Sequence, residues 1–412
     1  EWEFRKGHDI EAAEGWEKVS VPHDWAIYGP FDKANDLQTV AVVQNGEDVA
    51  TEKTGRTGGL PYMGKGAYRR SLEIEAEEMD GRRHILYFDG AMSEAQVFVN
   101  GEKVCFWPYG YNSFWCDVTG QVKEGGNEIA VLLENREQSS RWYPGAGLYR
   151  KVRHITLPQV HVPVWGTYVT TPHVSYDHAT VRIRTKINGV QDGSAVTVKT
   201  RIIDQQGNVV AEETDTRQIH KGEVEQNISV RRPALWSPED PALYSAETEV
   251  YTGGSVDTDW DMDRPEISVR HGKDLQDKVS TRFGFRTIEI IPEKGFFLNG
   301  QARKFRGVCL HHDLGPLGAA VNKAAIRHQL TMLKDMGCDA IRTSHNMPAE
   351  ELIELCDEMG FMVMCENFDE WDIAKCENGY HRFFNQDSGD GRIWAERDMI
   401  NMLHHFRNNP SV

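Results

Sequence analysis

Several features that would assign the chain to a large class of proteins are missing from its sequence. There is no run of about eighteen apolar residues, and residues 1–10 have no apolar core of the kind found in export signals. Basic residues are few, because 46 Lys and Arg stand against 63 Asp and Glu, for a formal net charge of −17. That charge repels a phosphate backbone. We therefore expect a soluble chain with no nucleic-acid partner and no membrane segment, its export signal removed or never present.

Cysteine is scarce and irregularly placed. The chain has seven cysteines, an odd number, and no C-x-x-C pair. This pattern argues against a disulfide framework and against a structural zinc site. Free thiols are expected, although a disulfide between Cys105 and Cys116 across a hairpin stays open. The cysteines therefore do not decide between periplasm and cytoplasm.

Signatures of other enzyme classes are absent too. We find no G-x-S-x-G elbow, no phosphate-binding loop and no dinucleotide fingerprint, which excludes acyl and phosphoryl transfer. No H-E-x-x-H motif is present, so zinc hydrolase chemistry is not expected, and we assign no metal ligand. A hard cation held with waters by Glu366 or Glu370 stays open.

The pattern of short runs and turns divides the chain into three segments. A length of 412 residues suits several domains. Residues 1–157 show short alternating runs and turns such as Asn100-Gly101, which predict an all-β jelly-roll sandwich of the galactose-binding type. Residues 158–288 alternate with even spacing and predict an immunoglobulin-like β-sandwich. Residues 289–412 change to a strand–helix rhythm and predict the first part of a (β/α)₈ TIM barrel.

The third segment is too short for a whole barrel. We predict strands at residues 302–310, from residue 340 and at 361–365, and helices at 322–336, 350–359 and about 392–407. Three strand–helix units are fewer than half of a (β/α)₈ barrel, which needs about 250 residues.

Polar residues follow each of the three predicted parallel strands. In a barrel the carboxyl ends of the strands form the active site. Sugar hydroxyls need donors and acceptors, and sugar C–H faces stack on aromatic rings. The strand ends therefore predict a saccharide site, formed by His311, His312 and Asp313; by Thr343, Ser344, His345 and Asn346; and by Glu366, Asn367, Asp369, Glu370 and Trp371.

Short motifs occur in a fixed order along almost the whole chain. The early ones are VPHDW at 21–25, RWY at 141–143, GLYR at 147–150, LWSP at 235–238 and FGFR at 283–286. More specific ones are LNG at 298–300, RGV at 306–308 and IRTSHN at 341–346. In this order and spacing, the chain resembles glycoside hydrolase family 2, the β-galactosidases, β-glucuronidases and their relatives.

The resemblance implies roles for individual residues. His311, Arg342, His345 and Asn346 would shape the subsite for the non-reducing sugar, together with Glu366, Asp369, Glu370 and Trp371. Many relatives place an Asp near the position of Arg141, so Arg141 and Trp142 depart from the pattern. Glu370 roughly matches a magnesium ligand of well-known relatives, but Asp372 stands where a histidine is expected. Mg²⁺ therefore stays open for the full-length enzyme.

The resemblance also implies a retaining mechanism with two carboxylates. In the family, the acid/base Glu and the nucleophile Glu both follow a segment similar to residues 407–412, so both would lie beyond Val412, the last residue of this sequence. We expect no catalytic residue in the chain and no activity of the chain alone. Glu366, Asp369 and Glu370 are not expected to substitute for them. The uncovered parallel sheet edge predicts partial order or a homo-oligomer.

Other functions stay open at this point. The parent enzyme is expected to be a β-galactosidase that cleaves terminal β-glycosides, with β-glucuronidase or β-mannosidase as alternatives. A non-catalytic carbohydrate-binding protein and an interaction scaffold are further possibilities. Trp107, Tyr109 and Tyr111 could form a binding platform in the jelly roll, although such clusters usually belong to a core.

Overall fold

The N-terminal part of the chain is a sandwich of two β-sheets. The computed structural model describes residues 1–412 except 33–34, 36–39, 43–47, 50, 54–61 and 262–263. One sheet has the order β2-β1-β5-β10-β7-β8 and the other the order β11-β6-β9. The strands are β1 (Trp2–Lys6), β2 (Glu17–Val19), β5 (Gly64–Ile74), β6 (Arg82–Phe88), β7 (Ala95–Val99), β8 (Glu102–Trp107), β9 (Phe114–Asp117), β10 (Gly125–Asn135) and β11 (Val152–Pro158). Short elements accompany them: η1 (Trp25–Tyr28), α1 (Ala76–Met79), and the pair β3 (Val40–Val42) and β4 (Thr51–Lys53).

Local sequence explains the β7–β8 hairpin. Alternate residues Ala95, Val97 and Val99 are buried, so this face of β7 joins the core between the sheets. Asn100 and Gly101 connect the strands with φ of 50° and 82°, the left-handed conformation of a two-residue hairpin turn. The predicted hairpin is confirmed.

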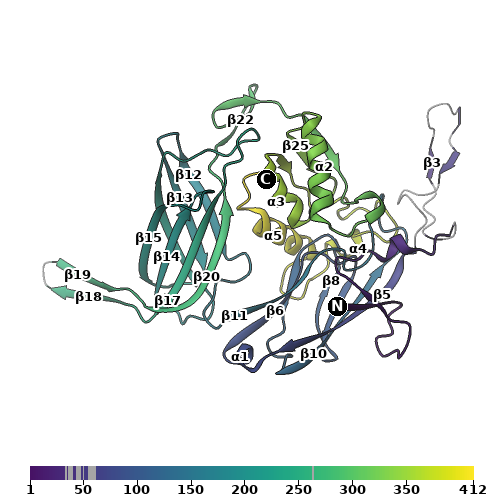
Figure 1. The fold of residues 1–412 in the computed structure, drawn as a ribbon, viewed down its shortest axis with the longest axis horizontal. Helices are drawn as coiled ribbons and strands as arrows, with labels where there is room; N and C mark the ends of the chain where they lie inside the picture. The colour runs from purple at the N-terminus through teal and green to yellow at the C-terminus, as the bar shows by residue number, and fades with distance from the viewer. Residues whose placement is uncertain (33–34, 36–39, 43–47, 50, 54–61, 262–263) are drawn as a thin grey trace.

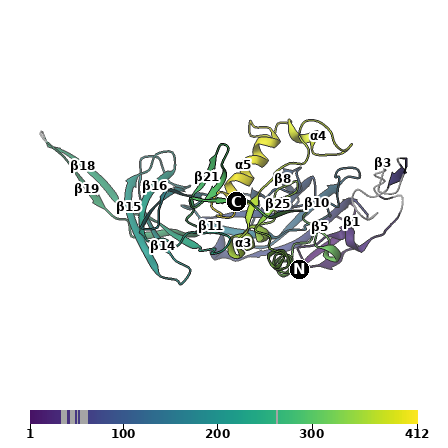
Figure 2. The same ribbon diagram turned by 90° about the horizontal axis from the view of Figure 1, so that it is seen from above.

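A second sandwich follows. Its sheets have the orders β12-β13-β16 and β15-β14-β17-β20, and residues such as Val181, Ile183, Ile202 and Ala246 fill the space between them. A hairpin of β18 and β19 projects from this sandwich in both views (Figures 1 and 2). The strands are β12 (Thr167–Val174), β13 (His178–Lys186), β14 (Ala195–Ile203), β15 (Val209–Gln218), β16 (Glu223–Arg231), β17 (Tyr244–Thr252), β18 (Ser255–Asp261), β19 (Arg264–Arg270) and β20 (Asp274–Phe283).

The C-terminal part is an α/β segment that lies between the two sandwiches (Figure 1). A small antiparallel sheet precedes a parallel sheet of order β24-β25-β26. The strands are β21 (Ile288–Ile291), β22 (Gly295–Leu298), β23 (Gln301–Arg303), β24 (Gly307–Leu310), β25 (Ala340–Thr343) and β26 (Met362–Met364). The helices are η2 (Gly315–Leu317), α2 (Lys323–Asp335), α3 (Glu350–Met359), α4 (His381–Phe384) and α5 (Trp394–Phe406).

Capping residues set the helix ends close to their predicted positions. The Asn322 side chain accepts a hydrogen bond from the Ala325 amide and so starts α2. Gly360, in the left-handed conformation, ends α3. The predicted strand over residues 302–310 is wrong as a single element, because β23 and β24 belong to different sheets. Asp339 fixes the bend between them, since its carboxylate accepts from the Arg306 amide at 2.7 Å and from Arg303 at 2.8 Å.

Buried polar side chains tie the three parts together. Arg150 is fully buried, and its guanidinium donates to the carbonyls of Asp89 and Tyr111 in the first sandwich and of Met347 and Pro348 before α3. Trp236 of the second sandwich donates to a carbonyl at the end of α3. The jelly-roll side and the α/β segment are thus held in a fixed relation at the strand ends.

Among the described residues, no helix is both long and apolar enough to cross a bilayer. The seven cysteines, including Cys105 and Cys116, form no disulfide in the structure.

Candidate active site

The pairing of the parallel strands aligns their polar ends. Leu310 of β24 pairs with Thr343 of β25, and Arg342 pairs with Met364 of β26. The residues that follow the three strands therefore start at nearly the same level of the sheet.

Arg342, His345 and Glu366 form a compact cluster at this edge. Arg342 donates from Nε to Oε1 of Glu366, and its Nη2 lies 3.0 Å from Nδ1 of His345. The same Nδ1 lies 2.9 Å from Oε2 of Glu366. A ring nitrogen either donates or accepts. Nδ1 of His345 therefore donates to Glu366 when it carries a proton and accepts from Arg342 when it does not. The Glu366 amide donates to the Thr343 hydroxyl at 3.0 Å, which fixes the third strand end against the second.

Trp142, from the first sandwich, lies against the first two strand ends. Its ring centroid is 4.8 Å from that of His311 and 5.6 Å from that of His345. The indole Nε1 donates to the Tyr111 hydroxyl at 3.1 Å, which orients the ring. The jelly roll thus supplies an aromatic wall to a site built on the α/β segment.

Arg141 reaches the third strand end. Its Nε donates to Oδ2 of Asp369 at 2.9 Å and its Nη2 to Oδ1, a two-pronged ion pair. Lys375 also contacts this carboxylate, with Nζ 3.3 Å from Oδ1 of Asp369. The positive charge of Arg141 is therefore balanced by an acid of the α/β segment.

Burial and charge set the protonation of these groups. Burial would raise the pKa of Glu366, but hydrogen bonds from Arg342 and His345 hold it below its usual value. The pKa of Asp369 is likewise lowered, because Arg141 outweighs burial. Burial, with the charge of His345, lowers the pKa of His311. The edge therefore presents ionised carboxylates, guanidinium groups and a neutral imidazole.

Three predicted site residues lie outside this cluster. Asn346 is buried and lines a small cavity of about 40 Å³, which His312 also lines. Trp371 is 64 % exposed, with no ring contact among the described residues. Glu370 is buried and faces its own loop, where its carboxylate accepts from the amides of Lys375, Cys376 and His381.

The surroundings of Glu370 decide whether this residue could be a ligand of Mg²⁺. Both carboxylate oxygens accept backbone N–H groups, which present positive ends where a cation would sit. Asp372 is exposed. These residues do not fit a Mg²⁺ site as they stand.

Val412, the residue beyond which both catalytic carboxylates are expected, lies away from the polar cluster. Its carbonyl accepts from Nη2 of Arg286 at 2.5 Å, and its side chain packs against the apolar core of the α/β segment. The carbonyl of Ser411 accepts from the Val363 amide of β26 at 2.7 Å. The end of the chain thus lies beside the third parallel strand, and Val412 is not itself a site residue. The placing of the two carboxylates beyond it stays a prediction.

The aromatic residues Trp107, Tyr109 and Tyr111 are buried in the core of the first sandwich, so a surface platform there is wrong. They pack toward the α/β segment: Trp107 donates to Oδ1 of Asp398 at 2.9 Å, and Tyr109 donates to the Asn367 carbonyl.

Sequence reasoning missed two buried acids, Asp24 and Asp398. Asp24 accepts from the amides of Ala26, Ala146 and Ala319 and from the Tyr143 hydroxyl. It therefore ties the loop after β24 to the jelly roll. Asp398 accepts from Trp107 and Tyr380, and burial raises its pKa to about 8. Asp24 lies in the VPHDW motif, and this motif is the one sequence feature that could have pointed to either acid.

Three family models match consecutive parts of the chain. The sugar-binding domain of glycosyl hydrolases family 2 matches residues 11–158, a second family 2 domain matches 160–262, and the family 2 TIM barrel domain matches 289–412. The chain belongs to glycoside hydrolase family 2. The predicted succession of jelly roll, immunoglobulin-like sandwich and partial TIM barrel is confirmed.

Relatives are similar over the whole chain. It is 37 % identical to a protein named β-galactosidase BoGH2A from Bacteroides ovatus, covering 100 % of this chain and 45 % of that protein. It is 25 % identical to a β-glucuronidase of Bacteroides fragilis, over 100 % of this chain and 54 % of that one. A crystal structure of a family 2 member from Bacteroides cellulosilyticus superposes with a TM-score of 0.84 at 30 % identity, over 100 % of this chain and 50 % of that one. The chain thus spans about half the length of these relatives.

Proposed function

We propose that this chain forms one side of the sugar subsite of a retaining β-glycosidase that acts on terminal β-galactosides. The observation that carries the proposal is the meeting of Trp142 with His311, His345, Arg342 and Glu366 at one edge of the parallel sheet. An aromatic wall beside fixed donors and acceptors suits a sugar ring with several hydroxyls. The choice of galactoside follows the name of the Bacteroides ovatus relative.

In this proposal the chain's own residues bind and orient the sugar. The ionised Glu366 accepts hydrogen bonds from sugar hydroxyls, Arg342 and His345 donate to hydroxyl oxygens, and Trp142 covers the apolar C–H face. Arg141 and Asp369 close the side of the subsite nearest the jelly roll.

None of these carboxylates suits the chemical steps. A general acid in glycoside hydrolysis needs a raised pKa, whereas the pKa values of Glu366 and Asp369 are lowered. Both oxygens of each carboxylate also accept from a neighbouring residue, which weakens them as nucleophiles. We therefore assign proton transfer and nucleophilic attack to residues outside this chain, beyond Val412.

Calorimetric titration with methyl β-galactoside tests the proposal. We expect millimolar binding by the chain and no hydrolysis of nitrophenyl β-galactoside. Glu366→Gln keeps the size of the side chain and removes its charge, so affinity should fall at least about tenfold. Glu212→Gln is the matched control, since Glu212 lies on the second sandwich and pairs with Lys199 at 3.0 Å.

Two results would count against the proposal. If Glu366→Gln binds the sugar as tightly as the unaltered chain, the sugar binds elsewhere. If methyl β-glucuronide or methyl β-mannoside binds at least tenfold more tightly than the galactoside, the galactoside assignment is wrong but the subsite remains. Turnover by the chain alone would refute the assignment of both chemical steps to other residues.

A further inference from the structure

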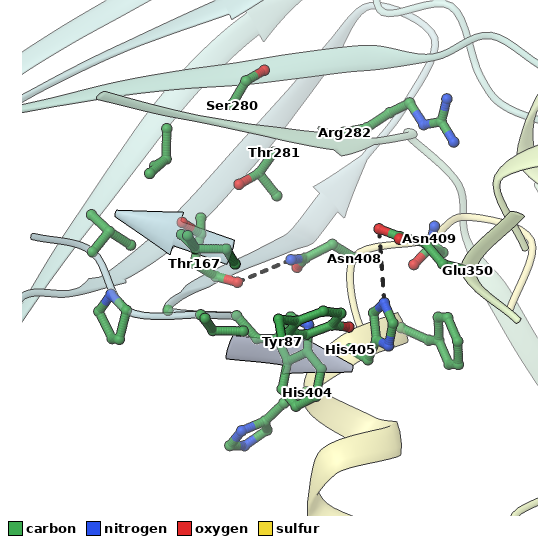
Figure 3. Close-up of a pocket in the computed structure, with 18 of the residues that line it drawn as sticks. Tyr87, Thr167, Ser280, Thr281, Arg282, Glu350, His404, His405, Asn408 and Asn409 are labelled. Carbon is green, nitrogen blue, oxygen red and sulfur yellow. Dashed lines mark hydrogen bonds and ion pairs between the residues drawn. The ribbon is translucent and has the colours of Figure 1, made fainter. Parts of the chain in front are cut away.

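A cavity lies where the two sandwiches meet the α/β segment. Its volume is about 450 Å³, and its walls come from β6 and β11, from β12 and β20, and from α3 and α5 (Figure 3). It is lined by residues that the sugar subsite does not use, among them Tyr87, Arg153, Thr281, Glu350 and His405. The cavity is therefore a separate feature of the three-part junction.

Glu350 and His405 face each other in the wall of this cavity. Figure 3 shows the two side chains facing each other, joined by a dashed line. Glu350 belongs to α3 and His405 to α5, and Nε2 of His405 lies 4.0 Å from Oε1 of Glu350. Arg153 donates to the other oxygen, Oε2. The guanidinium of Arg153 therefore occupies one oxygen of Glu350. Its Oε1 is turned toward His405 and away from Arg153.

Asp89 lies close to this pair. It follows β6, is fully buried, and accepts from the Ser113 hydroxyl at 2.9 Å through Oδ1. Its other oxygen, Oδ2, is buried and has no hydrogen-bond partner among the described residues, and neither does Nδ1 of His405. One ligand atom from each of Asp89, Glu350 and His405 lies within 4.8 Å of the other two. Within the described part of the chain, no other group of three such residues meets this condition.

The neighbouring cations do not satisfy Oδ2 of Asp89. Toward the described residues, the guanidinium of Arg150 donates to backbone carbonyls, including that of Asp89 itself. Arg153 is engaged with Glu350. A buried carboxylate oxygen without a donor is costly, and a bound cation or a proton removes that cost.

We propose that Asp89, Glu350 and His405 bind one Zn²⁺ ion, which links the jelly roll to α3 and α5. One imidazole and two carboxylates form a ligand set that zinc accepts, and the cavity supplies water as a fourth ligand. Around a tetrahedral Zn²⁺ ion the ligand atoms lie about 3.4 Å from one another. The ligand atoms of the three side chains, which lie within 4.8 Å of one another, therefore move slightly closer when the ion binds. Because the ligands come from the first sandwich and from two helices of the α/β segment, the ion stabilises the junction.

The test measures zinc bound by the 412-residue chain after chelator treatment and dialysis against buffered low free Zn²⁺. We expect one tightly bound ion per chain by mass spectrometry of the metal, and a rise in the thermal unfolding midpoint on adding Zn²⁺. His405→Gln and Asp89→Asn should each lose both effects. His404→Gln is the matched control, since His404 also lines the cavity but is not part of the group of three.

Folding of each variant is checked without metal by circular dichroism, so that a misfolded variant is not mistaken for loss of the site. If Asp89→Asn does not fold, His405→Gln carries the test. The proposal is overturned if the unaltered chain binds no more tight zinc than His405→Gln, or if His404→Gln loses as much. It is also overturned if Asp89→Asn raises the metal-free unfolding midpoint while the unaltered chain binds no zinc, because Asp89 is then a protonated acid. Selective binding of Mg²⁺ or Ca²⁺ in place of Zn²⁺ would contradict the assigned ion.

Discussion

The buried carboxylate of Asp24 offers a quantitative test of how the jelly roll positions the first strand end. Oδ1 accepts from the amides of Ala26 and Ala146 at 3.0 and 2.9 Å. Oδ2 accepts from the Ala319 amide at 2.9 Å and from the Tyr143 hydroxyl at 2.5 Å. Burial raises the pKa of Asp24, and these four donors oppose that rise.

Asp24→Asn changes this arrangement by one group. If the amide oxygen of the introduced side chain takes the place of Oδ1, its NH₂ group takes the place of Oδ2. This NH₂ group then faces the Ala319 N–H, and two donors cannot form a hydrogen bond. The Tyr143 hydroxyl can rotate and accept from the NH₂ group. One buried N–H is left unpaired, which costs about 2 kcal/mol. Asp24→Ala leaves three buried amides without an acceptor and should cost about 5 kcal/mol. That loss approaches the whole stability of an ordinary domain.

Urea unfolding followed by tryptophan fluorescence measures these costs, and hydrogen exchange of residues 314–320 locates them. Exchange in that loop should rise more in Asp24→Asn than exchange in the second sandwich. Asp335→Asn, at an exposed position at the end of α2, should change stability by less than about 0.5 kcal/mol. If Asp24→Asn matched this control and left loop exchange unchanged, Asp24 would not hold the strand end in place.

Three further predictions concern other contacts around the site. A double-mutant cycle of Arg141→Met and Asp369→Asn should give a coupling of about 1 kcal/mol by urea unfolding, because the pair is two-pronged but partly exposed; no coupling would refute the ion pair. The pKa of the Asp398 carboxyl is about 8 in the folded chain, well above its ordinary value. Between about pH 4 and pH 8 this carboxyl therefore loses its proton more readily in the unfolded chain, and the free energy of unfolding falls as the pH rises. Asp398→Asn should remove that loss, at most about 4 kcal/mol between pH 5 and 8, and equal pH profiles for variant and unaltered chain would contradict the assignment. Glu370→Gln should speed hydrogen exchange at residues 375–381, and unchanged exchange there would mean that Glu370 does not anchor the loop.

The elements that sequence predicted well are those fixed by neighbouring residues. The β7–β8 hairpin depends on Asn100-Gly101 and on alternate burial over five residues. Helix α3 begins shortly after Pro348 and ends at Gly360, so both of its ends are set by residues next to it in the sequence. The polar strand ends could also be predicted to meet, because parallel strands in register bring their carboxyl ends to one edge.

What the sequence did not predict depends on contacts between distant residues. Arg141 and Asp369 are 228 positions apart, and no periodic pattern connects them. Glu370 looked equivalent to Glu366, yet backbone amides of the following loop turn it away from the cluster. The break between β23 and β24 follows from Asp339, which lies more than thirty residues beyond that break and accepts from Arg303 and Arg306.

A crystal structure of the chain soaked with methyl β-galactoside would show whether Trp142 and the three strand ends form one saccharide subsite. We expect one ordered sugar whose hydroxyls contact Glu366 and His345 and whose C–H face lies on Trp142. A sugar bound on the outer surface of the jelly roll, with this edge of the sheet empty, would contradict it.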